Sequence, residues 1–148
     1  MAEYTTYSFL DLSGAIVSPD LGAYIFTGQG VGQVTVSMDT ERTTHNVGAD
    51  GAVMVSKVAG HSGKVQIQCQ QTSRVHKWLL AAENAMYLAD VKDWAGISAT
   101  LRNASDGTTH VCTGMSFGKV PDKVYQAEGQ MVTWTLWAAS IQSLATPS

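Results

Sequence analysis

The side chains able to bind a metal ion or to act as nucleophiles are few, and their spacing matches no metal-binding or catalytic motif. No HxH or HExxH pattern occurs among the four histidines, which are His45, His61, His76 and His110. His110 and Cys112 would share one face of a strand, but a zinc site needs two further ligands from elsewhere. The sequence therefore predicts no metal site, no catalytic residue and no cofactor.

Two glycine-rich segments invite comparison with phosphate-binding loops. Residues 28–32 read GQGVG, but no strand-then-helix context surrounds them. Residues 60–64 read GHSGK, which lacks the first glycine of a P-loop and has Val65 where a Mg²⁺-binding Ser or Thr is needed. We interpret the first segment as a loop and the second as a turn between strands. An enzyme is the least favoured class of function.

Three tryptophans, Trp78, Trp134 and Trp137, offer a different chemistry, because indole rings can stack on a ligand. Such side chains are more often core or interface anchors. A monomeric ligand-binding β-sandwich that uses Trp134 or Trp137 stays open as an alternative.

The composition describes a surface that is polar but poorly charged. The chain has 148 residues, which suits a single domain over residues 1–148, and a formal net charge of −3. Only 14% of the residues are charged, against about 25% in an average globular domain. The polar surface must come from the 15 Thr, 13 Ser and 9 Gln. The weak negative charge argues against a protein that binds nucleic acid through a basic patch.

The expected cellular setting is a reducing cytoplasm. Cys69 and Cys112 are too few for a disulfide framework, and the first residues show no secretion signal. No apolar run approaches the roughly 18 residues that a membrane span needs.

The dominant hydrophobic period is two, which predicts strands with one apolar face. It is clearest over residues 33–39 and 64–70, and a further strand is expected over residues 130–141. Asp50-Gly51 and Asp106-Gly107 are typical of tight turns between antiparallel strands. Residues 18–32 and 114–129, which contain several glycines and prolines, are expected to be loops.

One segment, residues 74–90, has helical spacing. Ser73 is a plausible N-cap. The apolar stripe of this helix is expected to pack against the sheet through Val75, Trp78, Leu79 and Ala82. The chain is therefore mainly β, a small antiparallel β-barrel or sandwich with one flanking α-helix.

Edge strands of soluble monomers usually carry Lys, Pro or bulges that block further pairing. The alternating strands of this chain present mostly Thr, Ser and Gln instead. This pattern fits strand edges that pair between subunits and polar faces that look into a shared, water-filled space. A monomeric β-sandwich with an ordinary polar surface fits the pattern equally well.

Three segments in the same order resemble a tail tube protein of contractile-tailed bacteriophages. They are YSFLDLSGAIVSPD, GADGAVMVSKVAGHSGKVQIQCQQTSRVHKWLLAA and GMSFGKVPDKVYQAEGQMVTWTLWAASI. The chain departs from the family at Ser73-Arg74, where related chains tend to read Ser-Pro. Proline is favoured but not required at the first helical position, so the helix is still expected.

The resemblance implies that six copies form a ring, that their strands join into an inter-subunit barrel, and that rings stack into a hollow tube. It also implies that the tube stands inside a contractile sheath and that DNA passes through its lumen. The implied partners are further copies of the chain, the sheath, baseplate and tail terminator proteins, and viral DNA that is not bound sequence-specifically. Assembly in the host bacterial cytoplasm, a place in the virion and no membrane insertion are also implied.

Two related systems, type VI secretion and contractile bacteriocins, use the same architecture, so a tube subunit of either kind is the alternative. A lumen for a polyanion should be hydrated and not basic, because clustered Lys and Arg would hold phosphates.

These considerations select three sets of residues. The lumen-lining candidates are Gln33, Thr35, Ser37, Asp39, Lys64, Gln66, Gln68 and Gln70. The opposite strand faces should turn to the core of the subunit, through Val34, Val36, Met38, Val65 and Ile67. A hairpin from about residue 43 to 57 should carry contacts to a neighbouring subunit or ring, with Thr44, Asn46, Asp50, Gly51 and Met54 as candidates.

Overall fold

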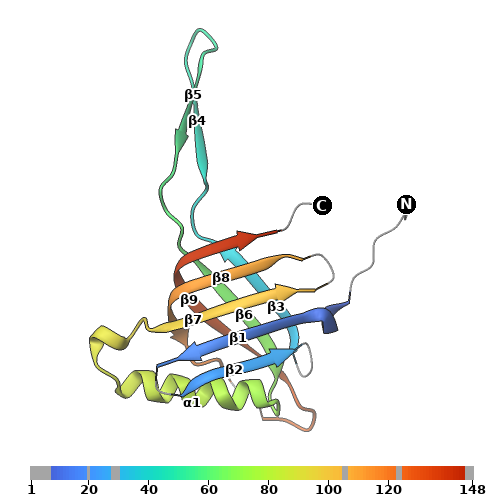
Figure 1. Ribbon diagram of the computed structural model, residues 1–148. Coiled ribbons are helices and arrows are strands. Elements are labelled where there is room, and N and C mark those ends of the chain that lie inside the picture. Colours follow the sequence, from blue (N-terminus) through green and yellow to red (C-terminus); the bar gives the residue numbers. More distant parts are fainter. Residues whose placement is uncertain (1–7, 20, 28–30, 105–106, 123–124, 146–148) are drawn as a thin grey trace.

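The computed structural model (Figure 1) describes residues 8–19, 21–27, 31–104, 107–122 and 125–145. Seven strands form one curled antiparallel sheet in the order β2-β1-β7-β8-β9-β6-β3. Two further strands, β4 and β5, form a separate hairpin that projects away from the sheet (Figure 1). The mainly β class and the flanking helix expected from the sequence are confirmed.

The elements have the following bounds. The strands are β1 Leu12–Ser18, β2 Gly22–Thr27, β3 Val31–Met38, β4 Thr43–Val47, β5 Val53–Lys57, β6 Gly63–Gln70, β7 Ile97–Asn103, β8 Thr109–Lys119 and β9 Met131–Leu144. The helix is α1 Arg74–Leu88, and two short 3₁₀ turns are η1 Phe9–Asp11 and η2 Val91–Asp93.

The core lies between α1 and the inner face of the curled sheet. Trp134 of β9 is fully buried there, together with Ile67 of β6 and Leu79 of α1. The Trp134 indole N–H donates to Nδ1 of His76, also buried, at 3.0 Å. This bond joins the helix to the sheet and satisfies two polar groups that would otherwise be costly to bury.

The helix begins where the sequence predicts, because Ser73 acts as its N-cap and accepts a hydrogen bond from the backbone N–H of His76 at 3.2 Å. It ends at Leu88, two residues before the predicted end. Val75, Leu79 and Ala82 are buried, whereas Trp78 is half-buried and stacks on Tyr24, with ring centres 5.4 Å apart. Trp78 therefore lies at the edge of the hydrophobic core, whereas Trp134 lies at the centre of the core.

Both segments expected to be loops contain strands. Residues 22–27 form β2, and β8 continues through Gly114 to Lys119. The glycines were misleading, because Tyr24, Ile25 and Phe26 have strong β-propensity and Gly114, at φ +63°, sits inside a paired strand. Among the described helices, none is long and apolar enough to cross a membrane.

The two predicted Asp-Gly turns lie where expected as far as they are described. Gly51 has φ +87° between β4 and β5, and Gly107 has φ +76° between β7 and β8. Asp106 and residues 28–30 of the glycine-rich segment lie outside the described residues. In the GHSGK segment, residues 60–62 form an irregular connection, and Gly63 and Lys64 begin β6, so the structure has no turn where the sequence predicted one.

Candidate functional site

The centre of the face of β3, β6 and β9 that points away from α1 is made of amide and hydroxyl side chains. The strand register aligns them in rows: Gln33 beside Gln68 beside Thr133. In the next row, Thr35 lies beside Gln66, which lies beside Thr135. Because strand side chains alternate, the residues between them, Val65 and Ile67, are buried on the opposite face.

A shallow hollow of this face is lined by Gln33, Thr35, Gln66, Gln68 and Thr133. Gln33 donates to Thr35 at 3.3 Å, and Gln66 donates to Thr135 at 3.5 Å. None of the lining side chains is charged. These groups can hold a layer of water, and they carry no charge that would attract or repel an anion.

One end of this polar face carries its only aromatic–cation pair among the described residues. The Lys64 ammonium lies 5.6 Å from the centre of the Trp137 ring, a cation–π contact. The indole lies over Gly118, where a Cβ atom would come within 2.5 Å of its Nε1 atom. Lys64 is therefore held over an aromatic surface and does not stand free above the face.

The remaining predicted residues of this face lie near its margins. Ser37 pairs with Lys64, and Asp39 is exposed just after the end of β3, where its N–H donates to Ser62 O at 3.1 Å. Gln70 is exposed at the far end of β6. The expected core position of Met38 is wrong, since its side chain is 38% exposed at the end of β3. Val34 and Val36 are partly buried against the core, on the expected side.

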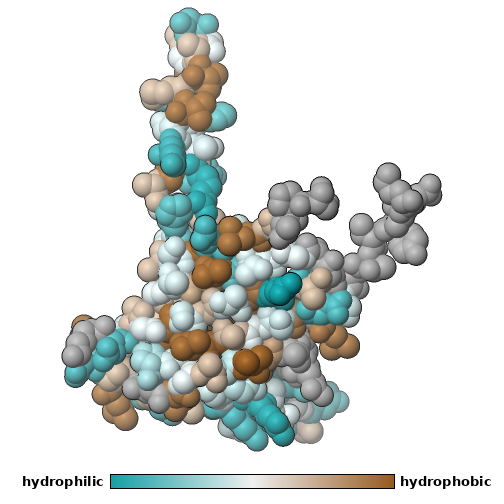
Figure 2. Space-filling model, in the orientation of Figure 1, coloured by the Kyte–Doolittle hydropathy of each residue, from teal (hydrophilic) through white to brown (hydrophobic). Residues whose placement is uncertain are grey.

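The β4–β5 hairpin is exposed at every one of its strand positions. The register pairs Asn46 with Met54 and Val47 with Val53. Four apolar side chains face solvent, with exposed fractions of 63% for Val47, 53% for Val53, 60% for Met54 and 60% for Val55. Figure 2 shows apolar atoms on this projecting arm. An isolated two-stranded hairpin is marginally stable in water, and this one leaves its apolar side chains exposed.

Two strand edges are unpaired among the described residues. The sheet ends at β2 on one side and at β3 on the other, and each of these pairs with one neighbour. Ile25 of β2 is 74% exposed. Neither β2 nor the outer edge of β3 shows the lysines or prolines that commonly protect an edge.

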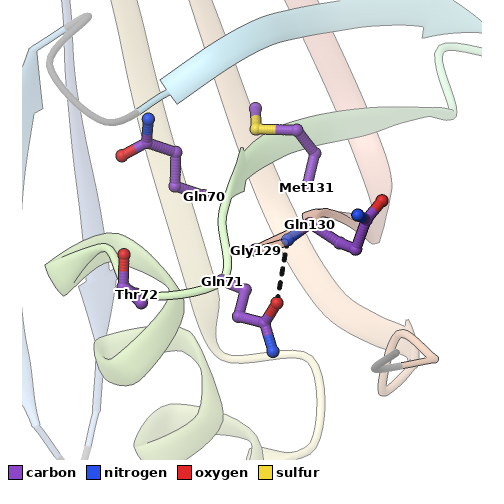
Figure 3. A pocket seen from close by; sticks show the side chains of 6 residues that line it. All are labelled: Gln70, Gln71, Thr72, Gly129, Gln130 and Met131. Atoms are coloured by element: carbon purple, nitrogen blue, oxygen red, sulfur yellow. Dashed lines mark hydrogen bonds between the residues drawn. The ribbon is translucent and has the colours of Figure 1, made fainter. Parts of the chain in front are cut away.

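A second hollow lies at the end of β6 and the start of β9 (Figure 3). It is lined by Gln70, Gln71, Thr72, Gly129, Gln130 and Met131. The Gln71 side-chain oxygen accepts from the Gln130 N–H at 2.9 Å, and the Gln71 N–H donates to Gln130 O at 3.1 Å. These two bonds fix the β6–α1 connection to the segment before β9. We call these six residues the amide hollow.

The residues considered for metal or nucleophile chemistry are not brought together. No group of three possible metal ligands forms within the described part of the chain. His110 Nδ1 is 2.7 Å from the Ser143 hydroxyl, while Cys112 is buried. Burial raises the pKa of the Cys69 and Cys112 thiols, so both stay protonated at neutral pH.

The three tryptophans do not form a ligand platform either. Trp78 stacks on Tyr24, Trp134 is fully buried, and Trp137 lies on the polar face. Trp134 and Trp137 are three residues apart on one strand, so they point to opposite faces. A ligand-binding surface shared by these rings is therefore excluded.

Sequence reasoning missed Thr133 and Thr135, which complete the polar rows on β9, and it missed the amide hollow. The first could have been found from the alternation in MVTWTLWA, where Thr133, Thr135 and Trp137 oppose Val132, Trp134 and Leu136. The second depends on how β6 and β9 pair, which no local pattern predicts.

A sequence model of the family described as Bacteriophage PhiTE tail tube protein matches residues 4–145 of the chain. No curated protein matches it.

Several solved structures share the fold. A chain of the PVC extracellular contractile injection system sheath/tube terminator, extended state, has a TM-score of 0.60 at 12% identity, covering 97% of this chain and 100% of that one. A chain of the PVC sheath–tube complex, extended state, has a TM-score of 0.56 at 11% identity, covering 97% and 94%. A chain of the anti-feeding prophage tube-terminating cap has a TM-score of 0.57 at 8% identity, covering 99% and 95%.

Proposed function

Because the chain belongs to the Bacteriophage PhiTE tail tube protein family, we propose that it is the structural subunit of a contractile phage tail tube. The family match confirms the resemblance seen in the sequence. In this proposal six copies form a ring, rings stack into a hollow tube inside a contractile sheath, and DNA leaves through the lumen. The chain acts as one tail-tube domain, and its place is the virion, after assembly in the host bacterial cytoplasm.

The observation that carries the proposal is the polar face of β3, β6 and β9, whose central rows carry no charge. We assign it to the lumen, with Gln33, Thr35, Gln66 and Gln68 at its centre. A DNA duplex carries one negative charge per about 1.7 Å of its axis, with condensed counterions. A basic wall would displace these counterions, bind the DNA tightly and stall its passage. Amide and hydroxyl groups keep the wall hydrated without binding the DNA phosphates tightly. Lys64, held on Trp137, is the single cation of the row.

The two unpaired edges support ring closure. Pairing the β3 edge of one subunit with an edge strand of the next would satisfy backbone groups that one copy leaves open. A ring that closes on itself has no edge left. The outer face of α1 is then available to the sheath, and the ends of the tube to baseplate and terminator proteins.

A related alternative is a tube subunit of a type VI secretion or bacteriocin-like system. It is supported by the shared fold with chains of the PVC and anti-feeding prophage complexes. Neighbouring genes that encode a capsid and a terminase would favour the phage tail, and their replacement by secretion genes would favour the alternative.

The proposal is tested by electron microscopy and sedimentation of the purified protein over a range of concentrations. Rings of six subunits and tubes of uniform width are expected. Material that stays monomeric at high concentration, with or without a sheath protein, would contradict the proposal and favour the monomeric β-sandwich.

Assembly should depend on the turn of the β4–β5 hairpin. Gly51→Val places a β-branched residue at φ +87°, which we expect to cost the hairpin about 1–2 kcal/mol. Gly51→Asn is the control, because asparagine tolerates this conformation. Tube formation, measured by sedimentation, should be reduced in the valine variant and retained in the asparagine variant, with the sheet intact by circular dichroism in both. Equal assembly of the two variants would show that the hairpin carries no contact between subunits.

A further inference from the structure

His76 is a titratable side chain buried in the first turn of α1. Its exposed fraction is 2%, and among the described residues only Ser18 is a further buried polar side chain. The backbone N–H of His76 donates to the Ser73 hydroxyl at 3.2 Å, and that hydroxyl donates to Gln70 O at 2.7 Å. These two bonds tie the first turn of the helix to the end of β6, which holds the imidazole ring inside the core.

The hydrogen bond from Trp134 fixes which ring nitrogen of His76 carries the proton. An indole N–H can only donate, and it donates to Nδ1 at 3.0 Å. A nitrogen that accepts a hydrogen bond holds a lone pair there, so the proton of the neutral ring is on Nε2. A second proton would have to bind Nδ1, where it would point at the indole N–H. Charging the ring therefore requires that the bond between the helix and the sheet break.

The helix itself opposes a positive charge at this position. His76 is in the first turn of α1, where the helix dipole is positive. Arg74 and Lys77 are cations of the same turn, and that turn contains no acidic residue. Glu83 lies two turns further along α1, roughly 10 Å away along the axis. No carboxylate of the helix is therefore placed beside the ring.

The sheet offers no compensating charge within the described part of the chain. The titratable side chains that it buries in the core are Cys69 of β6 and Cys112 of β8, and both thiols are neutral because burial raises their pKa. Tyr24 of β2 packs its ring on Trp78 and is also neutral at ordinary pH. An imidazolium would thus enter an apolar core, which disfavours the charged form.

We propose that His76 is a proton-sensitive link between α1 and the sheet. Uptake of one proton from the solvent at Nδ1 breaks the hydrogen bond from Trp134 and weakens the attachment of the helix. This inference concerns a single subunit and does not depend on the proposed tube function.

The direction of the pH dependence follows from where the proton binds. A histidine in the unfolded chain takes up a proton below its ordinary pKa of about 6.5, whereas the folded chain keeps His76 neutral. The unfolded state then binds more protons than the folded state, so stability is complete above that pH and is lost as the pH falls. Well below this pKa, the equilibrium constant for unfolding should rise about tenfold for each pH unit through His76 alone.

The variant His76→Asn tests the inference. Asparagine keeps an acceptor oxygen near the position of Nδ1 but cannot take up a proton at this pH. Urea unfolding is measured for both chains at about pH 6 and pH 5. Over this interval the unfolding constant of the unmodified chain should rise about eightfold more than that of the variant. The matched control is His45→Asn, an exposed histidine of the β4–β5 hairpin, which should keep the full acid dependence.

Nitrogen NMR of the unmodified chain gives a second reading that needs no variant. While the protein is folded at about pH 5.5, the signal of His76 Nδ1 should stay that of an unprotonated acceptor, and the amide protection of α1 should fall before that of β9 as the pH is lowered. Equal acid losses in the unmodified chain and in His76→Asn would overturn the inference. A doubly protonated His76 ring in a folded chain with α1 still protected would also overturn it, and this result decides the question if His76→Asn does not fold.

Discussion

Replacing Trp134 by alanine is expected to lower the free energy of unfolding by about 3–5 kcal/mol. Its ring is fully buried between α1 and the sheet, and Phe117 packs on it edge-on with ring centres 5.6 Å apart. The substitution leaves a large cavity and removes the donor to His76 Nδ1. Because the free energy of unfolding of a native protein is only about 5–15 kcal/mol, this substitution should remove a large part of the total stability.

Two variants make this experiment specific. Trp137→Ala is the matched control, because Trp137 is 46% exposed on the same strand, and its loss should cost about 1 kcal/mol or less. Trp134→Phe keeps most of the ring but leaves the buried His76 nitrogen without this donor, with an expected cost of about 1–3 kcal/mol. Urea unfolding followed by circular dichroism gives all three values. Equal effects of Trp134→Ala and Trp137→Ala would mean that α1 does not pack on β9 as described.

Placing positive charge on the polar face is expected to trap DNA in the tube. In the variant Q66K/Q68K, each subunit adds two ammonium groups to a wall otherwise made of amides and hydroxyls. Simultaneous contact with 6–10 phosphates makes affinity fall by about 10³–10⁵ between 50 and 200 mM salt. DNA release should therefore be blocked at low salt and recover as salt rises.

The control carries opposite charge at the same two positions. Q66E/Q68E changes the same side chains but cannot bind phosphate, so its DNA release should resemble that of the parent particle. Release is followed by the fluorescence of a DNA dye after sheath contraction, at several salt concentrations. If both variants release DNA alike and without dependence on salt, β6 does not line the conduit.

The elements with an unbroken local signal could be predicted from the sequence. The alternation around β3 and β6, the Ser73 N-cap and the Gly51 turn each depend on neighbouring residues, and each is present. Gly22 and Pro19 suggested a loop where β2 forms, because glycine and proline weaken a strand locally. The strand forms nevertheless, because its pairing with β1 compensates for this weakness.

The surfaces proposed for assembly were harder to predict. The polar rows depend on register: Gln66 lies between Thr35 and Thr135, which are one hundred residues apart in the sequence. Trp78 and Trp134 look alike in the sequence, but only the second is central to the core. Trp134 belongs to β9, an interior strand between β8 and β6, whereas Trp78 stacks on Tyr24 of the edge strand β2. Which side chain meets which strand is decided by tertiary pairing, and no single segment contains that information.

The central claim is that the face of β3, β6 and β9 lines the lumen, and a cryo-electron microscopy map of the assembled tube at side-chain resolution tests it most directly. We predict that Gln33, Gln66 and Gln68 face the central channel, with α1 on the outside. A map that places these glutamines against the sheath, with α1 bordering the channel, would contradict the account.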